Sequence, residues 1–172
     1  MELWDLYDKN RNYTGKGKER GERFEPDEYH IVIHLCIFNT QGDMLIQQRQ
    51  PFKKGWPGLW DITVGGSAMH LEDSQSCAER ETFEEIGYKV DLSDQRPFLT
   101  VHFQYGFDDY YIVQADVDIK DLVLQEEEVA QVKWADEEEI LTLLDKDQFV
   151  PYHKSLINLL FDLSNRRGAH SK

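Results

Sequence analysis

Apolar residues along the chain fall into short runs separated by polar turns. Residues 29–38 (YHIVIHLCIF) form the longest run, which is rich in β-branched side chains. The turn sequence NTQG at 39–42 and a second apolar run at 44–48 follow it. This order predicts a β-hairpin whose first strand is central and buried. The same pattern predicts further short strands at 1–9, 62–65, 88–92, 98–105, 109–117 and 130–134.

Three segments carry apolar residues at helical spacing. The first spans residues 73–86, with Asp73 as the expected N-cap and Gly87 as the expected C-terminal stop. The others span residues 136–144 and 152–163. Strands and helices mixed in this order predict an α/β fold, in which one sheet is covered by helices on both faces.

Both ends of the chain are poor in apolar residues. Residues 10–26 are polar, rich in glycine and densely charged, which predicts a loop or ribbon after the first strand. Residues 165–172 are expected to fray. The full length of 172 residues suits one domain with a sizeable core. We therefore interpret residues 1–172 as a single domain, of which 1–27 are an N-terminal strand and charged loop.

The chain is strongly acidic. It has 19 lysines and arginines against 33 acidic residues, a net charge of -14. Such a charge repels polyanions, so neither a nucleic-acid polymer nor an anionic membrane surface is an expected partner. An acidic protein that binds phosphates needs cations, and divalent metal ions held by carboxylates would supply them.

The sequence gives no sign of a targeting or membrane segment. The first residues lack a basic region followed by an apolar stretch, and no apolar run reaches 18 residues. Cys36 and Cys77 have neither a metal-site spacing nor a disulfide pattern, and we interpret both as small core residues. A cytoplasmic protein is the simplest expectation. The oligomeric state stays open, with a homodimer as one alternative.

One motif carries the candidate chemistry. The sequence GSAMHLEDSQSCAERETFEEIGY begins at Gly66, reaches Glu72 after five residues, and continues after seven more with RETFEEIG at 80–87. Its seven fixed glycine, glutamate and arginine identities would arise by chance with a probability on the order of 10⁻⁶ at average residue frequencies. The spacing is therefore strong evidence for a specific site.

Glu81, Glu84 and Glu85 fall within an arc of about 100° on the predicted helix, so their carboxylates are expected to face one point. Hard cations such as Mg²⁺ prefer oxygen ligands and keep waters and substrate phosphates in their coordination sphere. We predict that the three acids bind Mg²⁺ or Mn²⁺, with the carbonyl of Gly65 as a further ligand. The alternative, a merely solvated acidic face, is our interpretation of residues 137–139.

The rest of the motif is expected to shape the site. An ion pair between Glu72 and Arg80 would fix the preceding loop against the helix. The opposite side of the helix is expected to be buried and comprises Ala78, Thr82, Phe83 and Ile86.

The motif matches the signature of the Nudix hydrolase superfamily completely at its charged and glycine positions, and the chain is identified as a member. The resemblance implies a Nudix-type α/β/α sandwich with a mixed β-sheet and residues 66–88 as the Nudix box. It implies a metal-dependent hydrolase in which water attacks a phosphorus of a small diphosphate, such as a nucleoside diphosphate linked to another moiety. The catalytic residues would be Glu81, Glu84 and Glu85. The structural residues of the box would be Gly66, Glu72, Arg80 and Gly87.

Residues 28–90 also resemble the branch of the superfamily that includes isopentenyl-diphosphate isomerase. The segment RQPFKKGWPGLW at 49–60, together with His30, carries this resemblance. In that branch the positions matching Arg49 and Lys53 hold a diphosphate, which implies the same role here. Guanidinium and ammonium groups are both suited to phosphate.

The resemblance to the isomerases fails at their catalytic positions. Their cysteine would fall at Gly65, and two metal-binding histidines would fall at Ser67 and at about Arg23. Isomerases typically lack the acids that stand here at Glu81 and Glu84. These departures favour hydrolysis. An isomerase-like enzyme and a non-catalytic domain that senses a diphosphate stay as alternatives.

Several further residues are ambiguous in sequence. Related enzymes often keep a catalytic glutamate in the loop where this chain has QEEE at 125–128, so the identity of the general base stays open. Trp56 and Trp60 could stack on a base, although packing under the sheet is the favoured interpretation. No metal-ligand spacing connects His34, His70, His102 and His153.

Overall fold

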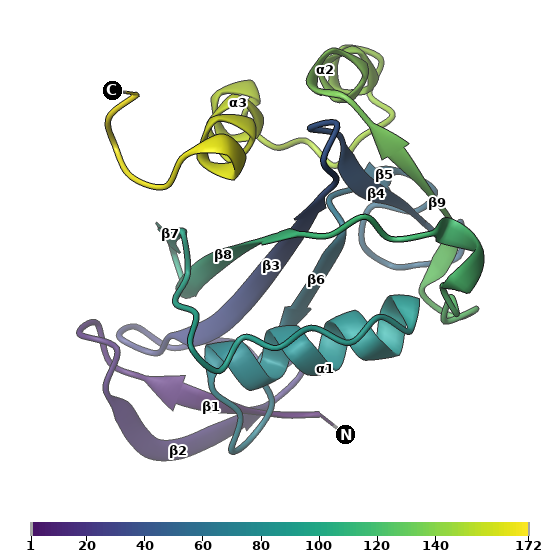
Figure 1. Ribbon diagram of the computed structural model, residues 1–172. Helices are drawn as coiled ribbons and strands as arrows, with labels where there is room; N and C mark the ends of the chain where they lie inside the picture. The colour runs from purple at the N-terminus through teal and green to yellow at the C-terminus, as the bar shows by residue number, and fades with distance from the viewer. Residues whose placement is uncertain (1, 172) are drawn as a thin grey trace.

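A mixed β-sheet forms the centre of the computed structural model, which describes residues 2–171 (Figure 1). The seven strands have the order β5-β4-β3-β8-β7, while β6 also pairs with β3 and β9 with β4. These strands are β3 (His30–Phe38), β4 (Met44–Arg49), β5 (Trp60–Asp61), β6 (Val64–Ser67), β7 (Leu99–Phe103), β8 (Gly106–Gln114) and β9 (Val129–Ala135). The other elements are β1 (Leu3–Tyr7), β2 (Tyr13–Glu19), α1 (Ser74–Ile86), the 3₁₀ turn Ile119–Asp121, α2 (Glu137–Asp145) and α3 (Lys154–Asn165).

Strand β3 is central and buried, as its sequence predicts. It runs parallel to β8 from His30 to Phe38 and antiparallel to β6. It pairs with β4 at Phe38 and Met44, beside the predicted turn, but β4 then takes β5 and β9 as partners. Thr63 fills the space between the diverging strands: its hydroxyl accepts a bond from Ile37 N and donates one to Leu45 O. The predicted hairpin is therefore present at its turn and opens beyond it.

Helices cover both faces of the sheet, which confirms the predicted α/β/α sandwich. Helix α1 lies on one side of the sheet and α2 and α3 lie on the other (Figure 1). Alternate residues of β3 divide between the two cores, because successive side chains of a strand point to opposite faces. Ile33 and Leu35 pack in the core under α1, whereas Cys36 and Phe38 pack with α2 and α3.

Helix α1 begins and ends where its sequence predicts. Asp73 caps the N-terminus, with Ser76 N donating to Asp73 Oδ1 over 2.8 Å and Ser76 Oγ accepting from Asp73 N over 3.0 Å. Such a cap contributes about 0.5–2 kcal/mol. Gly87 ends the helix in the left-handed region, at a φ of 69°. Its N–H donates to the carbonyl of Phe83.

The buried side of α1 differs from the prediction in one residue. Ala78, Thr82 and Ile86 are buried as expected, but Phe83 is 51% exposed. At about 100° per residue Phe83 lies roughly 145° from the middle of the buried arc, beyond its edge. Glu85 lies inside that arc and is buried. The sheet therefore covers one of the three predicted metal-binding acids.

The N-terminal region forms a two-stranded antiparallel ribbon, β1 with β2, which packs beside α1 (Figure 1). Most of β2 is exposed, in keeping with its polar sequence. Tyr7 and Tyr29 exchange backbone hydrogen bonds of 2.8 and 3.1 Å, which connect the ribbon to the start of β3. Residues 10–26, expected as a loop or ribbon, thus include a strand.

One expectation for the connecting segments is wrong. The strand predicted at 88–92 is absent: these residues have no helix or strand, and their apolar side chains pack against the core under α1. Glu79 accepts a hydrogen bond of 2.6 Å from Leu92 N, which holds this coil in place.

Residues 166–171 also lack helix and strand, but Arg167 lies over the ring of Phe98 at 4.2 Å. Within residues 2–171, no helix has the length and apolarity needed to cross a membrane.

Candidate active site

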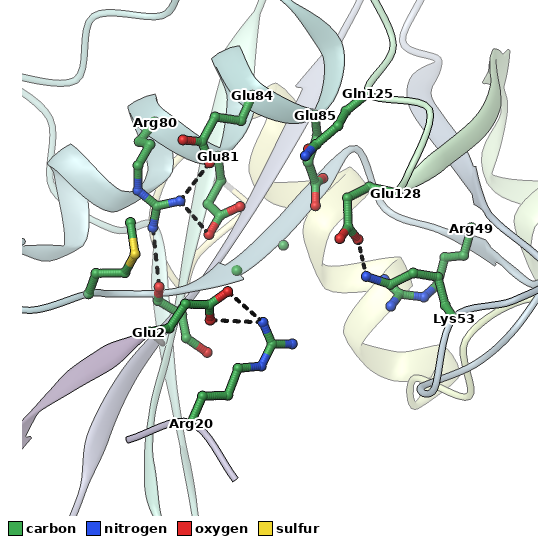
Figure 2. A pocket seen from close by; sticks show the side chains of 14 residues that line it. Glu2, Arg20, Arg49, Lys53, Arg80, Glu81, Glu84, Glu85, Gln125 and Glu128 are labelled. Carbon is green, nitrogen blue, oxygen red and sulfur yellow. Dashed lines mark hydrogen bonds and ion pairs between the residues drawn. The ribbon is translucent and has the colours of Figure 1, made fainter. Parts of the chain in front are cut away.

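A cleft of about 360 Å³ lies beside α1 (Figure 2). Its size is within the usual range for small-molecule sites. Five separate parts of the chain line it: the ribbon, the end of β4 with the segment that follows, β6 with Met69, α1, and the loop before β9. The lining residues are Glu2, Arg20, Arg49, Lys53, Gly65, Gly66, Ser67, Met69, Arg80, Glu81, Glu84, Glu85, Gln125 and Glu128. The structure thus brings the predicted metal-binding acids and the predicted diphosphate-binding residues into one cleft.

Arg80 organises the acids on its side of the cleft. Its Nε donates to Glu72 Oε1 over 2.6 Å and its Nη2 donates to Glu72 Oε2 over 2.9 Å, which forms the predicted ion pair. Its Nη1 lies 2.8 Å from Glu81 Oε1 and 2.9 Å from Glu84 Oε2. The same guanidinium reaches the carbonyl of Ser67 at 3.3 Å. Arg80 therefore ties the loop and β6 to the acidic side of α1.

Glu81 occupies the space above Gly66. A Cβ placed on Gly66 would lie 2.3 Å from both Cδ and Oε1 of Glu81, far inside van der Waals contact. The motif needs glycine here because the carboxylate takes the place of a side chain. Burial raises the pKa of Glu81 to about 7, although the Arg80 guanidinium acts in the opposite direction.

Glu85 is the most deeply placed acid of the cleft. Its Oε2 accepts a hydrogen bond of 2.9 Å from Gln47 Nε2, and Gln47 comes from the buried part of β4. Burial and the neighbouring Glu81 raise the pKa of Glu85 to about 8. The Oε1 atom of Gln47 is also buried and has no hydrogen-bond partner among the described residues. This corner of the cleft is rich in oxygen atoms and lacks a compensating positive charge.

The carboxylates do not converge in the arrangement seen here. Among residues 2–171 no three histidine, cysteine or acidic side chains are positioned to hold a metal ion. Glu81 and Glu84 point toward Arg80, while Glu85 is held by Gln47 (Figure 2). The donor set nevertheless fits a hard divalent cation, because it consists of oxygens and because burial penalises the charges of Glu81 and Glu85 until a cation offsets them.

Arg49 and Lys53 lie across the cleft from α1 (Figure 2). Arg49 Nε donates to the carbonyl of Gly55 over 3.0 Å, and its Nη1 lies 3.7 Å from Asp61 Oδ2. The ammonium of Lys53 forms an ion pair with Glu128. Both cations therefore line the same cleft as the acids of α1, and each has a carboxylate nearby.

The acidic run before β9 contributes two of its four residues to the cleft lining, Gln125 and Glu128. Gln125 N donates to the backbone carbonyl of Glu85 over 2.9 Å, which joins this loop to the end of α1. The sequence alone leaves all four positions open. Of the three glutamates in this run, Glu128 is the one in the cleft lining.

Three residues of the site have little or no signal in the sequence. Glu2 and Arg20 come from the ribbon, where the abundance of basic residues in an acidic protein is the one available hint. Gln47 lies within an apolar strand and contacts Glu85 through a pairing that only the folded sheet creates.

The two cysteines, His30 and the two tryptophans lie outside the cleft. Cys36 and Cys77 are fully buried, and burial raises the pKa of both thiols. His30 stacks on Trp4 at 4.7 Å, and burial lowers its pKa to about 4. Trp60 packs against the core, as expected. The same expectation is wrong for Trp56, which is 52% exposed on the loop after β4.

Comparison with known families agrees with this geometry. The NUDIX domain matches residues 28–160. The chain belongs to the Nudix family. An uncharacterised Nudix hydrolase of Listeria monocytogenes is 48% identical over 170 residues, covering 99% of each chain. The expectation of a Nudix hydrolase acting on phosphoric anhydrides is thereby confirmed.

More distant relatives support the fold and the resemblance to the isomerases. A Corynebacterium glutamicum isopentenyl-diphosphate Delta-isomerase is 25% identical over 160 residues, covering 87% of this chain and 85% of its own. The crystal structure of the Deinococcus radiodurans protein DR0079 superposes with a TM-score of 0.75. It is 19% identical and covers 92% of this chain and 99% of its own, which shows a shared fold.

Proposed function

We propose that this Nudix hydrolase is a divalent-metal-dependent pyrophosphohydrolase that directs water onto a phosphorus of a small diphosphate. One observation carries the proposal: Glu81, Glu84 and Glu85 line the same cleft as Arg49 and Lys53. Acidic oxygens and phosphate-binding cations on facing walls are the two halves of a site for a metal-bound diphosphate.

The acids of α1 would hold Mg²⁺ or Mn²⁺, with the carbonyl of Gly65 as a candidate further ligand. A bound metal ion would polarise phosphoryl oxygens and lower the pKa of a water molecule. Arg80 positions Glu81 and Glu84 from behind through its ion pairs. Its own charge is shared among carboxylates, so we assign it a positioning role rather than a substrate contact.

Arg49 and Lys53 would bind the diphosphate oxygens. Lys53 is paired with Glu128. When the ammonium of Lys53 turns to a phosphate, the Glu128 carboxylate is released from this pair and can accept a hydrogen bond from a water molecule. Glu128 is therefore the residue of the 125–128 run to test as general base, taking the proton from the attacking water.

The isomerase alternative is weakened by the position of the thiols. Neither cysteine lines the cleft, and Gly65 stands where an isomerase would carry its catalytic cysteine. A sensor without catalysis would not require three acids in the lining. Nucleoside diphosphates linked to another moiety stay the first substrate class to test.

A phosphate-release screen tests the proposed function directly. The purified protein would be incubated with nucleotides, sugar nucleotides, dinucleotides and isoprenoid diphosphates, with Mg²⁺, Mn²⁺ or EDTA. We expect at least one class to release phosphate or a phosphomonoester with either metal and not with EDTA. Isomerisation of isopentenyl diphosphate without phosphorus–oxygen cleavage, or no metal-dependent release from any class, would overturn the proposal.

A further inference from the structure

The N-terminal ribbon forms a wall of the cleft and places Arg20 there. Arg20 follows β2 directly, and its N–H donates to the carbonyl of Glu2 over 2.9 Å. The Arg20 guanidinium then donates to both carboxylate oxygens of Glu2, over 3.0 and 2.8 Å. Figure 2 shows this pair at the mouth of the cleft, facing the acids of α1.

The ribbon that carries Arg20 is fixed to the body of the protein. At its turn, Arg11 Nη1 donates to Asp109 Oδ1 over 2.9 Å, and Asp109 is completely buried in β8. Ser74, the first residue of α1, donates to the same carboxylate over 2.5 Å. Near the cleft, His70 N donates to the carbonyl of Leu3 over 2.7 Å. The ribbon is therefore tied to β8 through the Arg11 side chain and to the loop before α1 through its own backbone.

The guanidinium of Arg20 is available to a ligand, in contrast to that of Arg80. Arg80 is bound by three carboxylates and is mostly buried, with a side chain 19% exposed. Arg20 is bound by Glu2 alone among the ion pairs of residues 2–171, and the two side chains are 61% and 45% exposed. An exposed pair of this kind contributes little to stability, so an incoming anion can replace Glu2 at small cost.

Arg20 also lies apart from the other substrate-facing cations. In Figure 2, Arg49 and Lys53 lie together beside Glu128, Arg20 lies apart from them beside Glu2, and the acids of α1 lie above both groups. Among residues 2–171, the lining contains Met69 as its one apolar side chain and no aromatic ring. Charged groups therefore dominate recognition inside this cleft. The cations that can bind a substrate lie at two separate places, Arg20 at one and Arg49 with Lys53 at the other.

We propose that Arg20 forms a second anion subsite. Nη1 of Arg20 alone donates to both Glu2 oxygens, and a phosphoryl oxygen replaces that carboxylate there. The planar guanidinium carries further N–H groups that suit a second phosphoryl oxygen. A substrate that fits this subsite carries a further phosphoryl group in addition to the diphosphate bound by Arg49 and Lys53. This inference rests on the proposed function for the position of that diphosphate.

Binding of two non-hydrolysable probes tests the subsite without turnover. Titration calorimetry in excess Mg²⁺ would compare methylenediphosphonate with its three-phosphorus homologue, bis(phosphonomethyl)phosphinate. We expect the wild type to prefer the longer probe. Arg20→Gln should weaken the longer probe by at least about tenfold, the effect of losing a charge-assisted hydrogen bond, and leave the shorter within about twofold.

Matched variants separate a local contact from a general change of charge. Lys16→Gln removes one positive charge from the same strand at an exposed position outside the cleft, and should change neither probe by more than about twofold. Glu2→Gln frees Arg20 and should tighten the longer probe by about two- to fivefold. Arg49→Ala should weaken both probes alike. Thermal melts would establish that each variant is folded.

Three results would overturn the subsite: equal binding of the two probes by the wild type, no binding of either, or equal effects of Arg20→Gln and Lys16→Gln. The hydrolysis proposal fails on a different measurement, the metal-dependent release of phosphate. If the wild type releases no phosphate while Arg20→Gln still abolishes the preference for the longer probe, the anion subsite stands and the proposed reaction does not.

Discussion

The requirement for glycine at position 66 comes from another residue of the motif, Glu81. The Glu81 carboxylate lies where the side chain of any other residue at 66 would stand. Sequence spacing alone identifies both positions as part of the box. It does not reveal that the glycine is required by the glutamate, because the contact joins β6 to α1 across the cleft.

Gly66→Ala should therefore displace the Glu81 carboxylate. We expect a loss of activity of at least about tenfold and destabilisation of about 1–3 kcal/mol, because a close-packed site must shift to admit the methyl group. Activity assays and thermal melts would measure both effects. Gly55→Ala is the matched control, since a Cβ there meets nothing within 4 Å. Equal behaviour of the two variants would contradict this account of Gly66.

Arg49 and Lys53 permit a second prediction at the residue scale. Arg49→Ala and Lys53→Ala should each raise KM for every diphosphate substrate by similar factors, equivalent to roughly 1.5–3 kcal/mol for a charged hydrogen bond. The order of preference among substrates should not change. Lys54→Ala, an exposed neighbour outside the cleft lining, should leave KM unchanged. A changed ranking with an intact KM for the best substrate would show that these residues bind the variable moiety instead.

At the scale of elements, the sequence predicts where α1 begins and ends but not which of its acids is buried. Asp73 and Gly87 fix its ends through local chemistry, so both ends can be read from the sequence. The burial of Glu85 cannot, because it depends on Gln47 from β4. The segment at 88–92 shows the same limit: its apolar residues serve core packing without strand pairing, and periodicity does not distinguish the two uses.

The buried acids of α1 predict how the metal-free protein responds to pH. Burial raises the pKa of Glu81 to about 7 and of Glu85 to about 8, from an ordinary value of 4.5. Between pH 4.5 and 8 the folded state therefore binds more protons than the unfolded state. The free energy of unfolding is then greatest at the low-pH end of this range and falls as the pH rises. Chemical denaturation with EDTA should show a loss on the order of 2 kcal/mol between about pH 5.5 and pH 8.

Neutral variants provide the control for this pH dependence. Glu81→Gln and Glu85→Gln each remove one titrating group and should flatten the decline in stability between the two pH values. Stability that rises with pH over this window in the metal-free wild type would contradict the assignment of the two acids.

Mg²⁺ should offset the free-energy cost of burying the charged carboxylates of Glu81 and Glu85. A cation that binds the folded cluster adds RT ln(1 + [L]/Kd) to the free energy of unfolding, and it also offsets the repulsion between the carboxylates. Thermal melts in millimolar Mg²⁺ should show a higher Tm for the wild type and no increase for Glu81→Gln/Glu85→Gln. If the wild type and the double variant respond alike, the acids of α1 do not form a metal site.

At the scale of the whole molecule, the cleft is assembled from parts that are far apart in the chain. The Nudix box supplies the acids, and its spacing is enough to predict them. The opposing wall depends on the divergence of β4 from β3, which turns Arg49 and Lys53 toward α1. The ribbon then closes one end with Arg20. No periodicity or motif in residues 2–20 encodes that placement, because it arises from the Arg11 and Asp109 contact between distant segments.

The central claim is that the acids of α1 bind the metal that activates phosphorus–oxygen cleavage. The most direct test is turnover by Glu84→Gln and Glu85→Gln on the substrate found by the release screen, at saturating Mg²⁺, with Glu138→Gln on the exposed start of α2 as control. Loss of a metal ligand and its charge should lower kcat by at least about 100-fold in both variants, with the fold kept and the control unchanged. Activity within a factor of a few of the wild type for both would contradict the account.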